Sequence, residues 1–342
     1  MTTDTTRPAS AGNRRGFDWA ALRADAQAAI PDATAALIAT AAIFAWLYAR
    51  VADGSSPTIE VMPMLADPGR YWMYWLCQAF GWSALLWAWI TVMLGLIRSA
   101  ARPAWNPLPP ARLERWHRTT SLTTIGLMFA HAFMFFAELV RGNEHDLGWA
   151  GRIGTAFVET FVPGGYATGT GQVAILLGLI ALYLAIPLGL AFYLRHRTGS
   201  RIWLALHRFI LVVYALSVWH TLLYGTNVWY DGWFRTTVWL LQLPVAALLL
   251  TRLLAPARRN ERLHTRGRTV RALGWTARIG TAAAILTVLA VAITGRDGGR
   301  TRGVEGAEMN VTQGMVWLAL FLFFAAITTT IALVARKKPQ TP

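Results

Sequence analysis

The chain alternates between long apolar runs and shorter polar segments, and this pattern governs most of its 342 residues. Eight apolar runs are long enough to cross a bilayer, since one crossing takes about 20 residues of helix. They lie near residues 34–52, 71–97, 118–140, 173–194, 202–223, 236–254, 277–294 and 313–335. The pattern therefore predicts an all-α fold, a polytopic membrane helical bundle of about eight transmembrane helices.

The composition points the same way. Hydrophobic residues make up 55% of the chain and charged residues only 14%, whereas soluble domains carry about a quarter charged residues. The single cysteine, Cys77, lies within an apolar run. A disulfide framework and a cysteine metal site are therefore both excluded.

The basic residues indicate how the bundle is oriented. One alternating set of polar segments holds 24 of the 32 Lys and Arg residues. This set consists of the N-terminal tail, 98–118, 195–208, 252–278 and the C-terminus. Basic loops stay in the cytoplasm, so we expect a multi-pass protein of the cell membrane with both termini cytoplasmic. Topology then explains the net charge of +15, and no motif suggests a nucleic-acid partner.

Four of the seven histidines lie in or at the ends of two apolar runs. The third run reads "HRTTSLTTIGLMFAH" from His117 to His131, and the fifth reads "LHRFILVVYALSVWH" with His207 and His220. The two runs point in the same direction because one span separates them. Spacings of fourteen and thirteen residues advance a helix by roughly 21 and 20 Å. Two levels result, each with one imidazole from each helix, and this arrangement suits two b-type haems held between histidines.

The angular positions of these histidines around their helices fit the two-haem arrangement less well than their depths do. A spacing of fourteen residues leaves two side chains about 40° apart around an ideal helix, and a spacing of thirteen leaves them about 140° apart. The fifth span therefore needs a tightened stretch, a bend or a different approach of the ring.

Two arginines follow the histidines that lie at the predicted cytoplasmic ends. Arg118 follows His117, and Arg208 follows His207. Arginine near the interface is suited to pairing with haem propionates, although basic residues are equally expected at this boundary. A non-redox alternative is a transporter whose histidines relay protons. Against it, Glu138 is the only acidic residue within the predicted spans, whereas proton-coupled carriers place such groups at mid-membrane.

This four-histidine pattern resembles the ferric reductase-like transmembrane domain. Ferric reductases, NADPH oxidases and the haem subunit of the periplasmic methionine sulfoxide reductase system share that domain. The resemblance covers roughly residues 34–254 and rests on the histidine spacings, including the thirteen-residue spacing. It implies that His117 and His207 bind one haem b on the cytoplasmic side. His131 and His220 would bind a second haem on the outer side, and all four would be iron ligands in an electron-transferring oxidoreductase.

The chain departs from the large members of that group after the sixth span. Those members continue into a flavin and nicotinamide-nucleotide domain, but no "HPF"-type motif is present here. We therefore expect no bound flavin or NAD(P)H, and a cytoplasmic flavoprotein reductase or membrane quinol as the donor. The acceptor would be a metal, a small molecule or a protein on the outer side. An alternative within the redox class is a haem-binding subunit dedicated to one periplasmic reductase.

The predicted organisation has five parts, and no catalytic side chain is proposed beyond the haem-binding residues. They are a cytoplasmic tail (1–33), a six-helix dihaem core (34–254), a basic cytoplasmic loop (255–276), two additional transmembrane helices (277–335) and a short cytoplasmic tail (336–342).

Overall fold

The computed structural model of the chain describes residues 16–99, 109–167, 169, 171–228, 232–254 and 311–335, and short helical pieces between 272 and 286. Within these residues the fold is helical, without strands. Seven helical segments among them are long and apolar enough to cross a membrane. They correspond to the first six predicted spans and the eighth, so the predicted polytopic helical bundle is confirmed. The predicted span 277–294 lies mostly outside the described residues.

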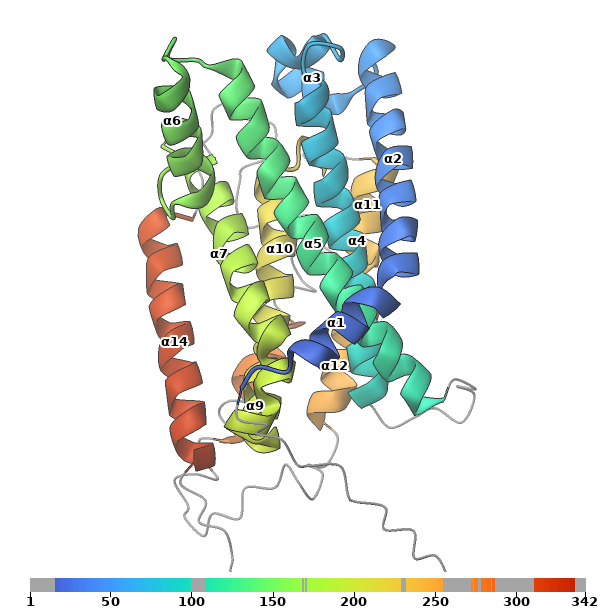
Figure 1. Cartoon of the computed structure of the whole chain (residues 1–342), viewed down its shortest axis with the longest axis vertical. Helices are drawn as coiled ribbons and strands as arrows, with labels where there is room; N and C mark the ends of the chain where they lie inside the picture. The colour runs from blue at the N-terminus through green and yellow to red at the C-terminus, as the bar shows by residue number, and fades with distance from the viewer. Residues whose placement is uncertain are drawn as a thin grey trace, which may run out of the picture.

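The long helices stand side by side as a bundle (Figure 1). Its main helices are α2 (Ile30–Ala52), α4 (Trp72–Ser99), α5 (Pro110–Gly142), α7 (Gly171–Leu190), α10 (Ile210–Tyr224), α12 (Gln242–Leu254) and α14 (Gln313–Ala335). α4 packs along α5, and α7 packs along α10. Trp75 of α4 and Leu176 of α7 are almost fully buried between helices. Apolar side chains also cover much of the outside, as expected where lipid is the solvent.

The fifth span is not the single helix that the sequence predicts. It is divided into α9 (Ser200–His207) and α10, which begins at Ile210. Around the break, the N–H of Phe209 donates to the carbonyl of Leu206, and the N–H of Val212 donates to that of Phe209, both at 3.0 Å. These bonds span three residues and wind the chain at three residues per turn. A tightened stretch, one of the three alternatives expected from the thirteen-residue histidine spacing, is therefore present.

The sixth span is also divided, into α11 (Trp233–Leu240) and α12. Pro244 consequently stands in the first turn of α12, where its missing N–H leaves no helical bond unmade. In the fourth span, Pro187 lies inside α7, shortly before a 3-10 turn, η2 (Ala191–Leu194), and the short helix α8 (Arg195–Thr198).

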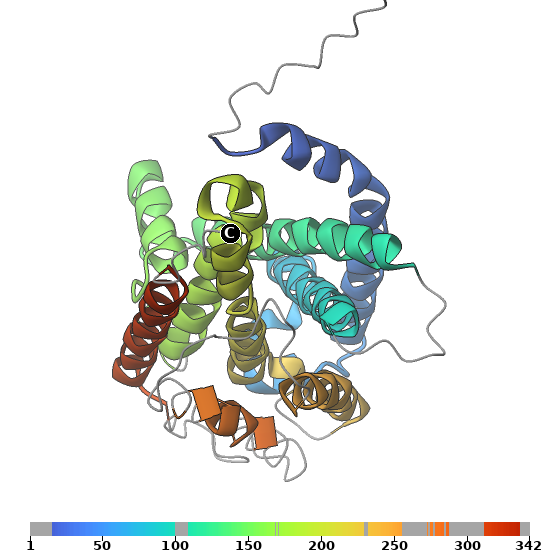
Figure 2. The ribbon, with the colours of Figure 1, turned by 90° about the horizontal axis from the view of Figure 1, so that it is seen from below.

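Several short helices were not predicted. α1 (Trp19–Ala28) lies within the polar N-terminal segment, and α6 (Trp149–Phe161) lies in the expected long outer loop. Smaller turns are α3 (Pro57–Val61), η1 (Pro63–Ala66) and η3 (Thr226–Val228). α1 crosses the bundle obliquely near the end that carries α9 (Figure 1), and the view from below shows it along the rim (Figure 2). α6 packs against α5 and α7 at the opposite end.

Candidate functional site

The four histidines of the third and fifth spans meet as two pairs. We call His117 and His207 the first pair, and their ring centroids are 5.8 Å apart. His131 and His220 are the second pair, with centroids 5.9 Å apart. Each pair has one ring from α5 and one from the α9–α10 segment. The structure thus brings together the residues that the spacing argument placed at common levels.

Each imidazole is hydrogen-bonded to the backbone of a neighbouring helix. His117 Nδ1 bonds the carbonyl of Thr91 (2.9 Å), His131 Nδ1 that of Cys77 (2.8 Å), His220 Nδ1 that of Ala174 (2.6 Å), and His207 the backbone of Leu188. A carbonyl oxygen only accepts, so Nδ1 carries the proton in the three bonds made by that atom. Their Nε2 atoms are left with a lone pair, which is the usual state of a metal-ligating histidine.

A repeated backbone pattern on α4 and α7 holds the rings. The four carbonyl residues are spaced by fourteen on each helix: Cys77 and Thr91 on α4, Ala174 and Leu188 on α7. Three of them have a glycine four residues later. A Cβ at Gly81 or Gly95 would lie 3.0 Å from the ring of His131 or His117, and one at Gly178 would lie 2.7 Å from His220. These imidazoles therefore rest directly on glycine backbone.

Sequence reasoning missed these glycines, although a signal was present. Gly81 and Gly95 are fourteen residues apart, as are His117 and His131. Two antiparallel helices with equal spacings bring one glycine against each histidine. Gly126, midway along the third span, differs from them. Among the described residues, no neighbouring atom lies within 4 Å of the point where its Cβ would stand.

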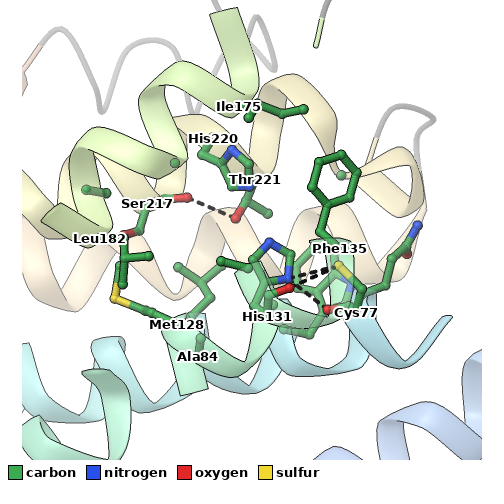
Figure 3. A pocket seen from close by; sticks show the side chains of 18 of the residues that line it. Cys77, Ala84, Met128, His131, Phe135, Ile175, Leu182, Ser217, His220 and Thr221 are labelled. Carbon is green, nitrogen blue, oxygen red and sulfur yellow. Dashed lines mark hydrogen bonds between the residues drawn. The ribbon is translucent and has the colours of Figure 1, made fainter. Parts of the chain in front are cut away.

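The rings of the second pair line a cavity. The space between its lining atoms is about 1170 Å³, which includes the part open to solvent. Figure 3 shows His131 and His220 projecting into it from α5 and α10, with Met128, Leu182 and Phe135 around them. Thr160 of α6 also lines the cavity, and its buried hydroxyl has no hydrogen-bond partner among the described residues. The walls are mainly apolar, as in most cofactor sites.

Two buried N–H donors near the first pair lack an acceptor. They are Nε of Arg118 and Nε1 of Trp203, which have no partner among the described residues. Trp203 stacks on His207 with centroids 5.6 Å apart and an interplanar angle of 22°. Arg118 lies over Phe192, which in turn packs against Trp203. Buried donors are rarely left unpaired, and carboxylates such as haem propionates would satisfy them.

The donor set distinguishes haem from a bare metal ion. Among the described residues, no group of three or more His, Cys, Asp or Glu side chains is arranged to hold a metal ion. Protein zinc sites use three or four protein ligands, whereas each pair here supplies two imidazoles. Two imidazoles would suffice to hold haem iron, because the macrocycle supplies the remaining ligands. The residues present therefore fit haem.

The two arginines predicted beside the haems have different surroundings. Arg118 forms an ion pair with Asp25 of α1, with 3.5 Å between Nη2 and Oδ1. The sequence did not predict this partner. Arg208 is exposed and lies in the break between α9 and α10. Its suggested role toward a propionate stays a prediction, as does that of Arg118.

Part of this chain is similar to a known protein family. No curated protein and no solved structure matches the chain. A family model described as the ferric reductase like transmembrane component matches residues 80–218. The match includes three of the four histidines and ends two residues before His220. Residues 80–218 of this chain are therefore similar to the ferric reductase like transmembrane component.

Proposed function

We propose that this chain is a membrane oxidoreductase that holds two b-type haems and carries electrons across the bilayer. The observation that supports it is the presence of two imidazole pairs at two levels of one helical bundle. The similarity of residues 80–218, which include three of the four histidines, to the ferric reductase like transmembrane component supports an oxidoreductase role. The chain belongs to the electron-transfer class under this proposal, rather than to proton-relaying transporters.

The protein's contribution is to hold and orient the ligands. Nε2 of each histidine would bind iron, while the backbone bonds at Nδ1 fix the ring orientation. The glycines allow the rings to lie close to α4 and α7. Arg118 and Trp203 would donate to carboxylates at the first pair. Haem bound in this way supplies a one-electron carrier at each level.

The direction of transfer follows from the basic loops. With both termini cytoplasmic, the first pair would face the cytoplasm and the second pair the outer side. A cytoplasmic flavoprotein reductase or membrane quinol would then deliver electrons near the first pair. A metal, small molecule or protein on the outer side would accept them near the second pair.

The experiment is to purify the protein, record its reduced-minus-oxidised spectrum and count haems per chain. We expect a b-type spectrum and about two haems. His131→Ala and His220→Ala should each remove the same haem, and His117→Ala and His207→Ala the other. His145→Ala, at an exposed position outside both pairs, is the matched control and should keep both. A purified protein without haem absorbance would overturn the proposal.

A further inference from the structure

The N-terminal helix α1 is fastened to the bundle beside the first pair by one buried carboxylate. Asp25 is only 9% exposed. Its Oδ2 accepts a hydrogen bond from the hydroxyl of Tyr193 at 3.0 Å, and its Oδ1 lies 3.5 Å from Nη2 of Arg118. The backbone N–H of Asp18 also donates to the carbonyl of Tyr193 at 3.0 Å. A carboxylate from a helix outside the predicted core is thus brought to the residue next to His117.

The same cluster extends to the other histidine of the pair. Arg118 lies over the ring of Phe192, at 5.3 Å from Cζ to the centroid. Phe192 packs edge-on against Trp203, which stacks on His207. Arg118 uses Nη2 toward Asp25, while its buried Nε has no partner among the described residues. The guanidinium is therefore held through one nitrogen and keeps a second donor for another acceptor.

The charges of Asp25 and Arg118 would affect the reduction potential of a haem bound nearby. A positive charge near a haem favours the reduced state, because reduction adds an electron, and a negative charge favours the oxidised state. The side chain of Asp25 is 12% exposed and that of Arg118 is 33% exposed, so water screens this pair less than a surface pair. Glu114 of α5 and Arg98 of α4 form another ion pair, but both side chains are about 40% exposed.

We propose that Asp25 is a positioning residue for the first-pair haem site: it orients Arg118 and offsets its charge, and so lowers the reduction potential at that level. The inference rests on the proposed function. It assigns a redox role to α1, a helix that lies outside residues 80–218 of the family match.

The test is a potentiometric titration of the purified, haem-loaded protein. Asp25→Asn should raise the midpoint of one of the two haem components and leave the other unchanged. Arg118→Gln should shift the same component downward. The double variant should return it toward the wild-type value, because the two charges are removed together.

Two variants separate charge from anchoring. Tyr193→Phe removes the hydrogen bond to Asp25 but keeps the charge of Asp25, and Asp25→Glu keeps the charge on a side chain that is one methylene longer. Both variants should leave the midpoints near wild type. An equal shift in Tyr193→Phe and Asp25→Asn would show that Asp25 only anchors α1, and would overturn the proposal.

Haem content, measured on every variant, separates a failure of the proposed function from a failure of the role of Asp25. A wild-type protein without haem overturns the proposed function itself. Two haems per chain with unchanged midpoints in Asp25→Asn overturn only the role of Asp25. Loss of one haem from Asp25→Asn, with Tyr193→Phe and Asp25→Glu keeping both at normal midpoints, would show that the charge serves haem retention and overturn the tuning role.

Discussion

The two histidine levels are held by the same backbone hydrogen-bond pattern but differ in their surroundings. At both, a carbonyl on α4 and one on α7 fix the imidazoles, and glycine follows four residues later in three of the four cases. In the fourth, after Leu188, the residue is Phe192, which packs against Trp203. The first pair is thus enclosed by aromatic and charged groups, whereas the second pair faces a largely apolar cavity. Under the proposed function, the shared hydrogen-bond pattern would orient the ligands at both levels, and the different surroundings would make the two haem sites unequal.

The largest expected effect comes from filling the glycine positions. Gly178→Ala places a Cβ at 2.7 Å from Nδ1 of His220, a distance that forces the ring or the helix to move. Overpacking of this kind costs about 1–3 kcal/mol, and here it acts on a ligand. We expect the second-pair haem to be lost, while Gly95→Ala affects the first-pair haem instead. Haem quantification with the redox difference spectrum measures both.

Gly154→Ala is the control for these variants. Gly154 lies in α6, and no neighbouring atom among the described residues is within 4 Å of an added Cβ. Alanine there should keep both haems and slightly favour the helix. If Gly178→Ala and Gly95→Ala reduced the same haem component, the assignment of the glycines to separate levels would be wrong.

Much of the fold follows from the sequence because long apolar runs have few alternatives in a bilayer. The division of the fifth span did not follow, because no proline or glycine marks the break. There the backbone N–H groups of Phe209 and Val212 each donate to the carbonyl three residues earlier in the chain. Each such residue turns the chain by about 20° more than an α-helical residue, which reduces the 140° offset between His207 and His220. α6 was missed because its 13 residues are too few for a span.

The histidines of the site were predictable because imidazoles are rare within apolar spans. The backbone groups that hydrogen-bond these histidines were harder to predict. Backbone carbonyls carry no residue-specific signal, so nothing in the sequence distinguishes Thr91 or Ala174 as hydrogen-bond partners. The pairing of Arg118 with Asp25 depends on how α1 folds back, and a polar N-terminal segment does not specify that path.

A smaller effect is expected from changing the aromatic residue Trp203 beside the first pair. Trp203→Phe keeps a ring against His207 but removes the buried Nε1–H. If that donor serves a haem carboxylate, its loss costs about 1 kcal/mol and weakens retention of the first-pair haem roughly fivefold. Competition by apomyoglobin for haem measures this. Trp116→Phe, at a position 40% exposed, is the control. Equal retention in both variants would show that Nε1 of Trp203 makes no contact with the cofactor.

On the cavity side, Thr160→Val tests the unpaired hydroxyl. Burying a hydroxyl without a partner costs about 1–3 kcal/mol, so valine should raise the thermal stability of the haem-free protein. If the hydroxyl donates to a group bound in the cavity, the same substitution should lower the stability of the haem-loaded protein. Thermal unfolding of the haem-free and haem-loaded proteins measures the change in stability of each form. Stabilisation of both forms would show that Thr160 has no bound partner.

The smallest effect should come from Cys77→Ala. The thiol lies 3.4 Å from Nδ1 of His131, but the strong bond at that nitrogen runs 2.8 Å to the carbonyl of Cys77, which any residue supplies. Sulfur is a weak acceptor, so alanine should keep both haems and shift the second-pair midpoint slightly. Gly81→Ala, four residues further along α4, should by contrast disturb the ring itself. If Cys77→Ala lost haem as Gly81→Ala is expected to, a side chain rather than the backbone would hold His131. The two levels would then no longer be held by the same backbone hydrogen-bond pattern, because Thr91, which bonds His117, has no thiol.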